Sequence, residues 1–268
     1  MTGDAHVDTM IVAGFCAFLG LFVGSFLNVV IYRVPAGESV VSPRSKCPFC
    51  GTQLSSWDNV PVVSWLILRA KCRTCGAHIS ARYPLIETAT AVLFGCVGWW
   101  LGLSWDLPAF LYLAAVGLAL AMIDLDTRRL PNSIVLPSYG VAIVLLGVAA
   151  IVDQRLPDLG RAVVSGAIAF AIYFVLALIY PAGMGFGDVK LAGVLGIYLG
   201  WVGWASVAVG LFAAFLLGAV VGIALMIVRR GGRKTAIPFG PFMIAGAFIG
   251  LWCGPAILNW YAGLVGLA

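Results

Sequence analysis

The chain has 268 residues, of which 62% are hydrophobic and 10% are charged, with a mean hydropathy of +1.05. Soluble domains carry about 25% charged residues, so this composition excludes an ordinary soluble protein and indicates a polytopic membrane protein. The formal net charge of +5 does not by itself indicate a nucleic-acid partner. Its meaning depends on which side of the membrane the basic residues lie.

Eight apolar runs predict about eight transmembrane helices, and hence an all-α polytopic fold. The runs cover residues 10–31, 84–103, 107–123, 134–152, 162–180, 191–202, 205–228 and 239–258. The sixth run is too short to cross about 30 Å of hydrocarbon unless residues 187–190 extend the helix or the bilayer thins locally. No Lys or Arg precedes the first run, so we interpret it as a retained span and not as a cleavable signal peptide.

The runs also predict a division of the chain into three parts. Residues 1–31 form the first transmembrane helix, residues 32–83 a small loop domain, and residues 84–268 a seven-helix membrane domain. Only the middle part is a long polar connection, so a small domain outside the membrane is expected there.

The basic residues predict the orientation of the chain. Fourteen of the 16 Lys and Arg residues fall in one set of alternate connections, and two fall in the other set. By the positive-inside rule the larger set faces the cytoplasm, so both termini face out. The larger set is Arg33, Arg44, Lys46, Arg69, Lys71, Arg73, Arg82, Arg128, Arg129, Lys190, Arg229, Arg230, Arg233 and Lys234, and the smaller set is Arg155 and Arg161.

The loop at residues 32–83 carries Cys47-Pro-Phe-Cys50 and Cys72-Arg-Thr-Cys75. Two such pairs at this spacing predict a structural zinc site, in which four thiolates close a tetrahedron and leave no position for a substrate. Four free or redox-active thiols are the alternative, and His78 is a less favoured competing ligand. Topology and contact with anionic lipid explain the basic residues of the loop, so no nucleic-acid partner is expected.

Two carboxylates, Asp124 and Asp188, stand at the ends of apolar runs on the same predicted side of the membrane. An ionisable side chain near membrane depth costs about 3 kcal/mol on insertion scales, so a functional role is its default interpretation. Asp126 competes with Asp124, but residues two apart do not share a helix face, so only one of them can point at Asp188. Two structural alternatives stay open: Asp188 as a helix N-cap, and Asp124 as the ion-pair partner of Arg128.

Paired carboxylates suit an aspartic peptidase, in which one carboxylate draws a proton from water and the other, protonated, activates the scissile carbonyl. This chemistry needs no metal. Gly185 and Gly187 would let the backbone approach an extended substrate closely, and Phe186 between them is either a wedge or a lipid-facing side chain. A proton- or ion-coupled transporter is the alternative from another class, and a non-catalytic assembly scaffold is a third.

Several motifs resemble those of the type IV prepilin peptidases, the bifunctional leader peptidases and N-methyltransferases of bacteria. The resemblance covers almost the whole chain and rests on residues 24–35, 42–47, 59–61, 64–66, 79–87, 123–132, 185–191 and 237–241. One departure is Ala70, where glycine is expected. It adds a single methyl group in the loop.

The resemblance implies that Asp124 and Asp188 are catalytic and that Gly185, Gly187 and Lys190 belong to an active-site loop. It implies a bacterial inner-membrane enzyme that cleaves prepilin and pseudopilin leaders after a glycine on the cytoplasmic face, for type IV pili and type II secretion. Methylation of the new N-terminal residue by S-adenosyl-L-methionine then follows, in association with the loop domain. No Gly-x-Gly-x-x-Gly fingerprint follows a predicted strand, so the methyltransferase residues stay unassigned.

Overall fold

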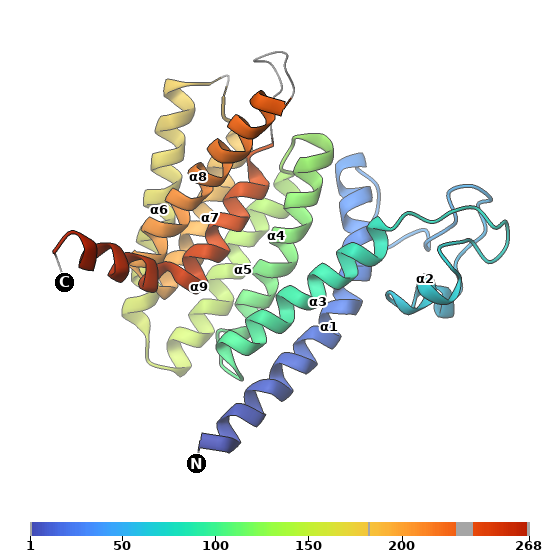
Figure 1. Cartoon of the computed structure of the whole chain (residues 1–268), viewed down its shortest axis with the longest axis horizontal. Coiled ribbons are helices and arrows are strands. Elements are labelled where there is room, and N and C mark those ends of the chain that lie inside the picture. Colours follow the sequence, from blue (N-terminus) through green and yellow to red (C-terminus); the bar gives the residue numbers. More distant parts are fainter. Residues whose placement is uncertain (1, 182, 229–237, 267–268) are drawn as a thin grey trace. The chain divides into compact units, whose positions relative to one another are not determined.

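The structure is a computed structural model, and it describes every residue except 1, 182, 229–237 and 267–268 (Figure 1). Its helices are α1 (Thr2–Ala36), the 3-10 helix η1 (Ser56–Asn59), α2 (Val63–Ile67), α3 (Arg82–Leu101), α4 (Leu107–Thr127), α5 (Asn132–Val152), α6 (Leu156–Ile179), α7 (Phe186–Val202), α8 (Trp204–Val228) and α9 (Gly240–Leu264). In the described residues, β pairing is limited to two isolated bridges in the loop. The predicted all-α fold is therefore confirmed, and η1 and α2 were not predicted.

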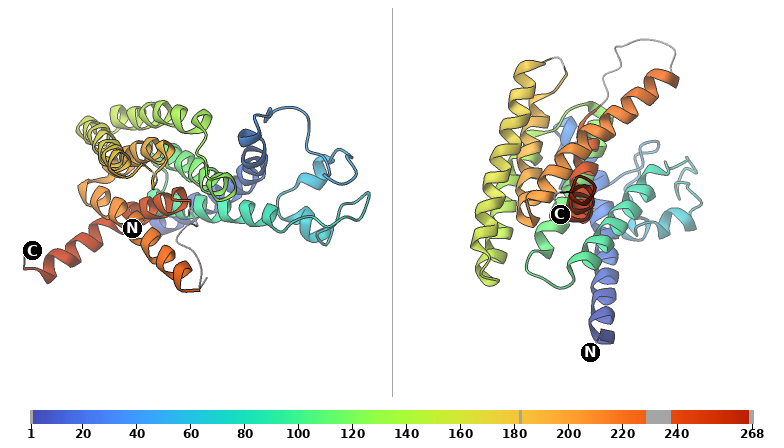
Figure 2. Two further views of the ribbon diagram at one scale, coloured as in Figure 1. Left: turned by 90° about the horizontal axis from the view of Figure 1, so that it is seen from above. Right: turned by 60° about the vertical axis from the view of Figure 1, so that its left-hand side comes forward.

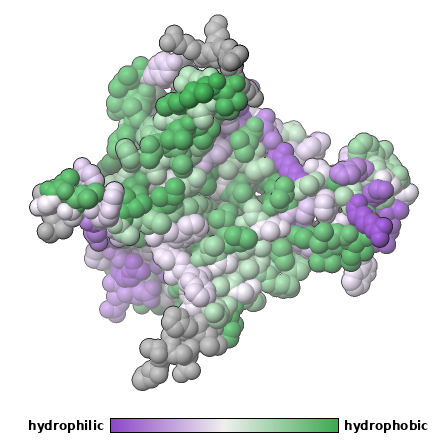
Figure 3. Space-filling model, viewed as in Figure 1, coloured by the Kyte–Doolittle hydropathy of each residue, from purple (hydrophilic) through white to green (hydrophobic). Residues whose placement is uncertain are grey.

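Seven of the described helices are long and apolar enough to cross a membrane, namely α1, α3, α4, α5, α6, α8 and α9. The eighth long helix, α7, has 17 residues and begins at Phe186. The sixth apolar run is thus extended at its start, which is one of the two alternatives that the sequence left open. Figure 3 shows apolar residues over much of the exposed helical surface, while polar residues gather over the loop between α1 and α3 and over the connection between α5 and α6. Such a surface suits contact with lipid.

The chain forms two compact units, Met1–Ala119 and Leu120–Ala268. The three-part division expected from the sequence stays a prediction. Four of the basic residues that entered the orientation argument, Arg229, Arg230, Arg233 and Lys234, lie outside the described residues, and so does Ile237 of the last motif.

In the first unit, α1 packs closely against α3 through small residues. A Cβ atom at Gly24 would lie 2.7 Å from the Cα atom of Glu87, and one at Gly20 would lie 2.7 Å from the Cα atom of Ala91. Small residues let membrane helices approach this closely. The carboxylate of Glu87 also accepts the backbone N–H of Val62 at 2.7 Å, which ties the loop to α3.

In the second unit, α7 lies between α5, α6, α8 and α9 (Figures 1 and 2). Every residue from Leu191 to Trp201 is buried. A helix that is apolar on all sides is expected to be enclosed by protein in this way. Because its neighbours shield it from lipid, α7 does not need the full length of a lipid-exposed span.

Glycines bring α6 and α7 together, and polar groups fix both ends of α7. A Cβ atom at Gly196 would lie 2.7 Å from the Cβ atom of Ala169. At the C-terminal end of α7, the Arg161 guanidinium donates to the carbonyls of Gly200 and Trp201, both at 2.7 Å. These bonds satisfy carbonyls that a helix end leaves open. The close packing on α6 and the Arg161 hydrogen bonds therefore fix the position of α7 within this unit.

Candidate functional site

Asp188 lies in the first turn of α7 and is 9% exposed. Its Oδ2 atom accepts the backbone N–H of Gly185, the N-cap residue, at 3.0 Å, and its own N–H donates to the Gly185 carbonyl at 3.0 Å. The N-cap alternative was therefore partly right, because the carboxylate satisfies a backbone N–H at the helix start although Gly185 holds the N-cap position. The Oδ1 atom has no hydrogen bond within the described part of the chain.

Asp124 lies in the last turn of α4 and is 4% exposed. Its Oδ2 atom accepts the backbone N–H of Gly240, the first residue of α9, at 2.9 Å. The ion-pair alternative is wrong, because no ion pair joins Asp124 to Arg128 among the described residues. Asp126 is exposed, so the structure buries only one carboxylate of this segment.

The two carboxylates belong to the same compact unit and interact electrostatically. They share one arrangement: Oδ2 binds the N–H of a glycine at the start of a helix, and Oδ1 makes no hydrogen bond to a described residue. Two carboxyls placed together exchange protons as a unit. Such a pair has one group to accept a proton and one group to donate it.

Gly187 and Lys190 lie in the first turns of α7, so the segment expected to be an active-site loop is mostly helix. A Cβ atom at Gly187 would lie 3.0 Å from the Cβ atom of Leu130, which leaves little room for a larger residue. Lys190 donates through Nζ to Oδ1 of Asn132 at 2.9 Å, and its carbonyl accepts the Tyr139 hydroxyl at 2.7 Å. These contacts position the helix start that carries Asp188.

Phe186 is 51% exposed and also contacts α6, so both interpretations from the sequence, a wedge and a lipid-facing side chain, stay predictions. Its ring meets Phe170 and Phe174 of α6 edge to face, with centroids 6.4 and 6.3 Å apart. The Lys190 ammonium lies 4.9 Å from the centroid of the Phe186 ring. Such aromatic and cation–π contacts have directional preferences, so they fix the first turn of α7 against α6.

The four loop cysteines, Cys47, Cys50, Cys72 and Cys75, come together with all their sulfur atoms within 4.8 Å of one another. The Cys47 and Cys75 sulfurs are 3.8 Å apart. Four thiolates at the usual zinc–sulfur distance of about 2.3 Å would lie about 3.8 Å apart on the edges of a tetrahedron. His78 is exposed and is not part of this group. The donor set thus fits a metal that prefers sulfur.

Each cysteine pair has the same backbone structure. The N–H of Cys47 donates to the Thr52 carbonyl at 2.9 Å, and the N–H of Cys72 donates to the Ala77 carbonyl at 2.8 Å. In both pairs the glycine after the second cysteine donates back to the first cysteine carbonyl at 2.9 Å. Both glycines have a φ near +70°, which favours glycine. The loop is therefore an internal repeat, Lys-Cys-x-x-Cys-Gly, that the sequence analysis missed.

Side-chain contacts hold the repeat together. Arg73 donates to Asp58 in η1 at 2.8 Å, and this contact, with a hydrogen bond from Ser55, holds the pKa of Asp58 below its ordinary value.

Ala70, where glycine was expected, has a φ of +59°. That conformation costs an L-residue about 1–2 kcal/mol, which gives the expectation of glycine at this position a physical reason.

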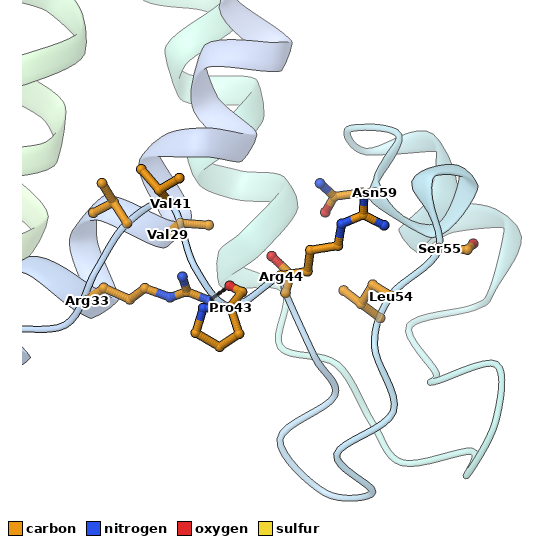
Figure 4. A pocket seen from close by; sticks show the side chains of 10 residues that line it. Val29, Arg33, Val41, Pro43, Arg44, Leu54, Ser55 and Asn59 are labelled. Carbon is orange, nitrogen blue, oxygen red and sulfur yellow. Dashed lines mark hydrogen bonds between the residues drawn. The ribbon is translucent and has the colours of Figure 1, made fainter.

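A cavity of about 320 Å³ lies between the end of α1 and the loop that follows it (Figure 4). Its lining combines apolar and polar side chains from α1, the loop and η1: Val29, Arg33, Val40, Val41, Pro43, Arg44, Ser45, Leu54, Ser55 and Asn59. Arg33 donates to the carbonyls of Ser39 and Pro43 at 2.9 and 2.8 Å, so its guanidinium holds this part of the cavity lining in place. Arg44 makes no hydrogen bond or ion pair with any described residue.

Gly240 is a site residue whose role was not predicted. A Cβ atom there would lie 2.8 Å from Oδ2 of Asp124, so only glycine leaves room for the carboxylate. Its motif, Pro-Phe-Gly-Pro at the start of the last apolar run, was part of the resemblance, but nothing in the sequence paired it with Asp124.

Comparison with known proteins gives a consistent result. Residues 18–101 match the family model described as Bacterial Peptidase A24 N-terminal domain, and residues 111–223 match the Type IV leader peptidase family. The chain is 36% identical to a protein of Stutzerimonas stutzeri over 273 residues, covering 92% of each chain, and 35% identical to one of Neisseria gonorrhoeae over 290 residues, covering 96% and 97%. Both are named prepilin leader peptidase/N-methyltransferase. No solved structure matches the chain.

The helices, the buried pair of carboxylates and these matches define a polytopic membrane protein of the peptidase class. The chain belongs to the type IV leader peptidase family. The family resemblance stated from the motifs is therefore confirmed.

Replacement of Gly240 by Ala is expected to lower leader-peptide cleavage, the activity in the relatives' names, by about 10-fold or more, because the new methyl group would displace the Asp124 carboxylate. Cleavage of a purified prepilin in detergent measures this. Gly263→Ala in the same helix is the matched control, since nothing lies within 4 Å of its Cβ position. Equal cleavage by Gly240→Ala and the wild type would contradict a role for Gly240 in positioning Asp124.

Proposed function

We propose that this protein is a membrane aspartic endopeptidase that removes the leaders of type IV prepilins and pseudopilins and then N-methylates the new N-terminal residue. The observation that carries the peptidase is the pair of buried carboxylates, Asp124 and Asp188, each held through one oxygen, while the other oxygen accepts no hydrogen bond from a described residue. The matches to proteins named prepilin leader peptidase/N-methyltransferase support both activities and the substrate class.

In the proposed cleavage, one carboxylate takes a proton from water, and the water oxygen attacks the scissile carbonyl carbon. The other carboxyl gives its proton to the carbonyl oxygen. The tetrahedral intermediate collapses when the carboxyl that took the proton from water gives it to the amide nitrogen. The C–N bond then breaks to release an amine, and a hydroxyl of the intermediate returns its proton to the other carboxylate. The hydrogen bonds from Gly185 and Gly240 support this scheme because they fix the direction of each carboxylate before substrate binds.

The proposed orientation places both carboxylates at the cytoplasmic side of the inner membrane, with both termini facing out. The excess of Lys and Arg in one set of connections supports it. Membrane lipid surrounds the helices, and the basic loop faces anionic head groups. No role for nucleic acid enters the proposal. The transporter alternative has no support from the family matches, which name a peptidase.

Replacement of either Asp124 or Asp188 by Asn is expected to lower leader cleavage by at least about 10³-fold, because the site then lacks a proton acceptor or donor. Cleavage of a prepilin by the purified variant, followed by mass spectrometry, measures this. Asp126→Asn, two residues from Asp124, is the matched control and is expected to cleave normally. Near-normal cleavage by either of the first two variants would refute the peptidase mechanism.

We further propose that the four-cysteine group binds zinc and that this zinc is structural. The sulfur-only donor set and the matching backbone structure of the two cysteine pairs support the proposal, because four thiolates fill the tetrahedral coordination of zinc. The loop is short and has little apolar core of its own, so a metal supplies the cross-link that stabilises its fold.

Purified protein is expected to contain about one zinc ion per chain, and replacement of Cys72 and Cys75 by Ser should remove it and make the loop sensitive to proteases. Elemental analysis by mass spectrometry measures the metal. Replacement of Cys96 and Cys253, which lie outside the group, is the control and should leave the zinc content unchanged. Absence of zinc from the wild-type protein would overturn the assignment.

We also propose that the loop-domain cavity holds S-adenosyl-L-methionine, which when bound supplies the methyl group. The volume lies at the lower end of the range of about 300–1,000 Å³ for small-molecule pockets. Arg44 has no hydrogen-bond or ion-pair partner among the described residues and suits the carboxylate of the methionine part, while Val29, Val41 and Leu54 offer an apolar wall to the adenosine part. In Figure 4 the Arg44 side chain extends from the loop towards Asn59.

Arg44→Gln is expected to weaken binding of S-adenosylhomocysteine about 10-fold, because the carboxylate loses its charged partner. Isothermal titration calorimetry of the purified protein measures this without turnover. Lys46→Gln, which removes a charge two residues away but outside the cavity lining, is the matched control. Leader cleavage should be unchanged in both variants. Equal affinities for wild type and Arg44→Gln would place the methyl donor elsewhere.

A further inference from the structure

A buried tyrosine of α6, Tyr173, belongs to the same compact unit as the two carboxylates and has no role in the proposed cleavage scheme. It ends a stripe of buried residues on the face of α6 that packs against α7. The other members of the stripe are Ala162, Ser165, Gly166 and Ala169. These members are small and let the helices touch, so the large ring of Tyr173 stands out among them.

The packing of α6 on α7 fixes the level of Tyr173. The Cβ position of Gly200 meets Ser165, and that of Gly196 meets Ala169, so the two helices run in opposite directions. One turn beyond the contact of Ala169 with Gly196, the same register brings Tyr173 of α6 level with Ala192 of α7. Ala192 is one helical turn from Asp188. The charge of Asp188 acts on Tyr173, in agreement with this register.

The Tyr173 ring also contacts the segment that holds the other carboxylate. Its centroid lies 5.2 Å from that of Phe215 and 6.4 Å from that of Phe239. Phe239 directly precedes Gly240, whose N–H binds Asp124. Tyr173 is thus in contact with the helix start that orients Asp124, and close in register to Asp188.

The Tyr173 hydroxyl has no hydrogen-bond partner among the described residues, although the residue is fully buried. A buried hydroxyl without a partner is unfavourable, so its position calls for a group that the protein chain does not itself supply. A neutral phenol is both a donor and an acceptor. Next to two carboxylates that cleave an amide, the group that most needs a further donor is the scissile carbonyl oxygen, which gains negative charge in the transition state.

We propose that Tyr173 is a third catalytic residue, whose hydroxyl donates a hydrogen bond to the scissile carbonyl oxygen during leader cleavage. The proposal rests on the proposed peptidase function. The hydroxyl keeps its own proton throughout, so the transfers between water, the two carboxyls and the leaving amine are unchanged. Its contribution is to stabilise the tetrahedral intermediate in a site shielded from water, where a fixed donor acts strongly.

Tyr173→Phe tests the proposal, because it keeps the ring contacts and removes only the hydroxyl. We expect kcat for cleavage of a prepilin to fall about 10²-fold with little change in KM, as for loss of one oxyanion donor. Thermal stability in detergent should be unchanged or higher, since no protein hydrogen bond is lost. Methylation of a prepilin supplied already cleaved should continue at the wild-type rate.

Tyr198→Phe is the matched control. It removes a second buried tyrosine hydroxyl, on α7, ten residues and about 15 Å along the helix from Asp188. Normal kcat in Tyr173→Phe, or an equal loss in both variants, would overturn the proposal. If Tyr173→Phe cleaves normally while the Asn variants of Asp124 and Asp188 are inactive, the catalytic role of Tyr173 is refuted and the proposed peptidase function stands.

Discussion

Both carboxylates are held by the backbone N–H of a glycine at the start of a helix. Gly185 binds Asp188 at the start of α7, and Gly240 binds Asp124 at the start of α9. The first N–H groups of a helix have no partner within the helix and carry partial positive charge, so they suit a carboxylate in an apolar environment. This constraint determines the rest of the site, because α7 and α9 must begin where α4 ends. The packing of the second compact unit keeps these helix starts in place.

The helix α7 is the element through which that packing acts. Its glycines let α6 approach, and Arg161 fixes its far end by binding the last carbonyls. Near the site, Tyr139 binds the Lys190 carbonyl, and Phe186 packs on two rings of α6. Asp188 is thus placed by contacts along the whole helix. A helix enclosed in this way holds a carboxylate more firmly than a mobile loop would, which favours preorganised chemistry.

The sequence predicted what depends on local pattern. The run at 134–152 agrees closely with Asn132–Val152, and the spacing of the cysteines indicated their meeting. It did not predict the partners of the site residues. Residues of α7 are apolar on all sides, so periodicity could not say which face meets α6. The bond between Gly240 and Asp124 joins residues 116 apart, and the role of Tyr173 depends on an unpartnered hydroxyl, which only packing defines. The Lys-Cys-x-x-Cys-Gly repeat is present in the sequence, but only the structure shows that both copies make the same backbone hydrogen bonds.

The order of the two proposed reactions follows from their chemistry. The amide nitrogen of the scissile bond carries no basic lone pair, and it becomes a nucleophilic amine only after the carboxylates have cleaved the bond. Methylation must therefore follow cleavage, whatever the arrangement of the sites. The cavity that we assign to the methyl donor is built entirely from residues before Ala119, and both carboxylates come after it. Since the two sites use separate residues in separate compact units, substitutions in the cavity and substitutions at the carboxylates should act on different steps. A full-length prepilin would lose both products when cleavage is blocked, whereas a substrate with a free amine would need only the first unit's chemistry.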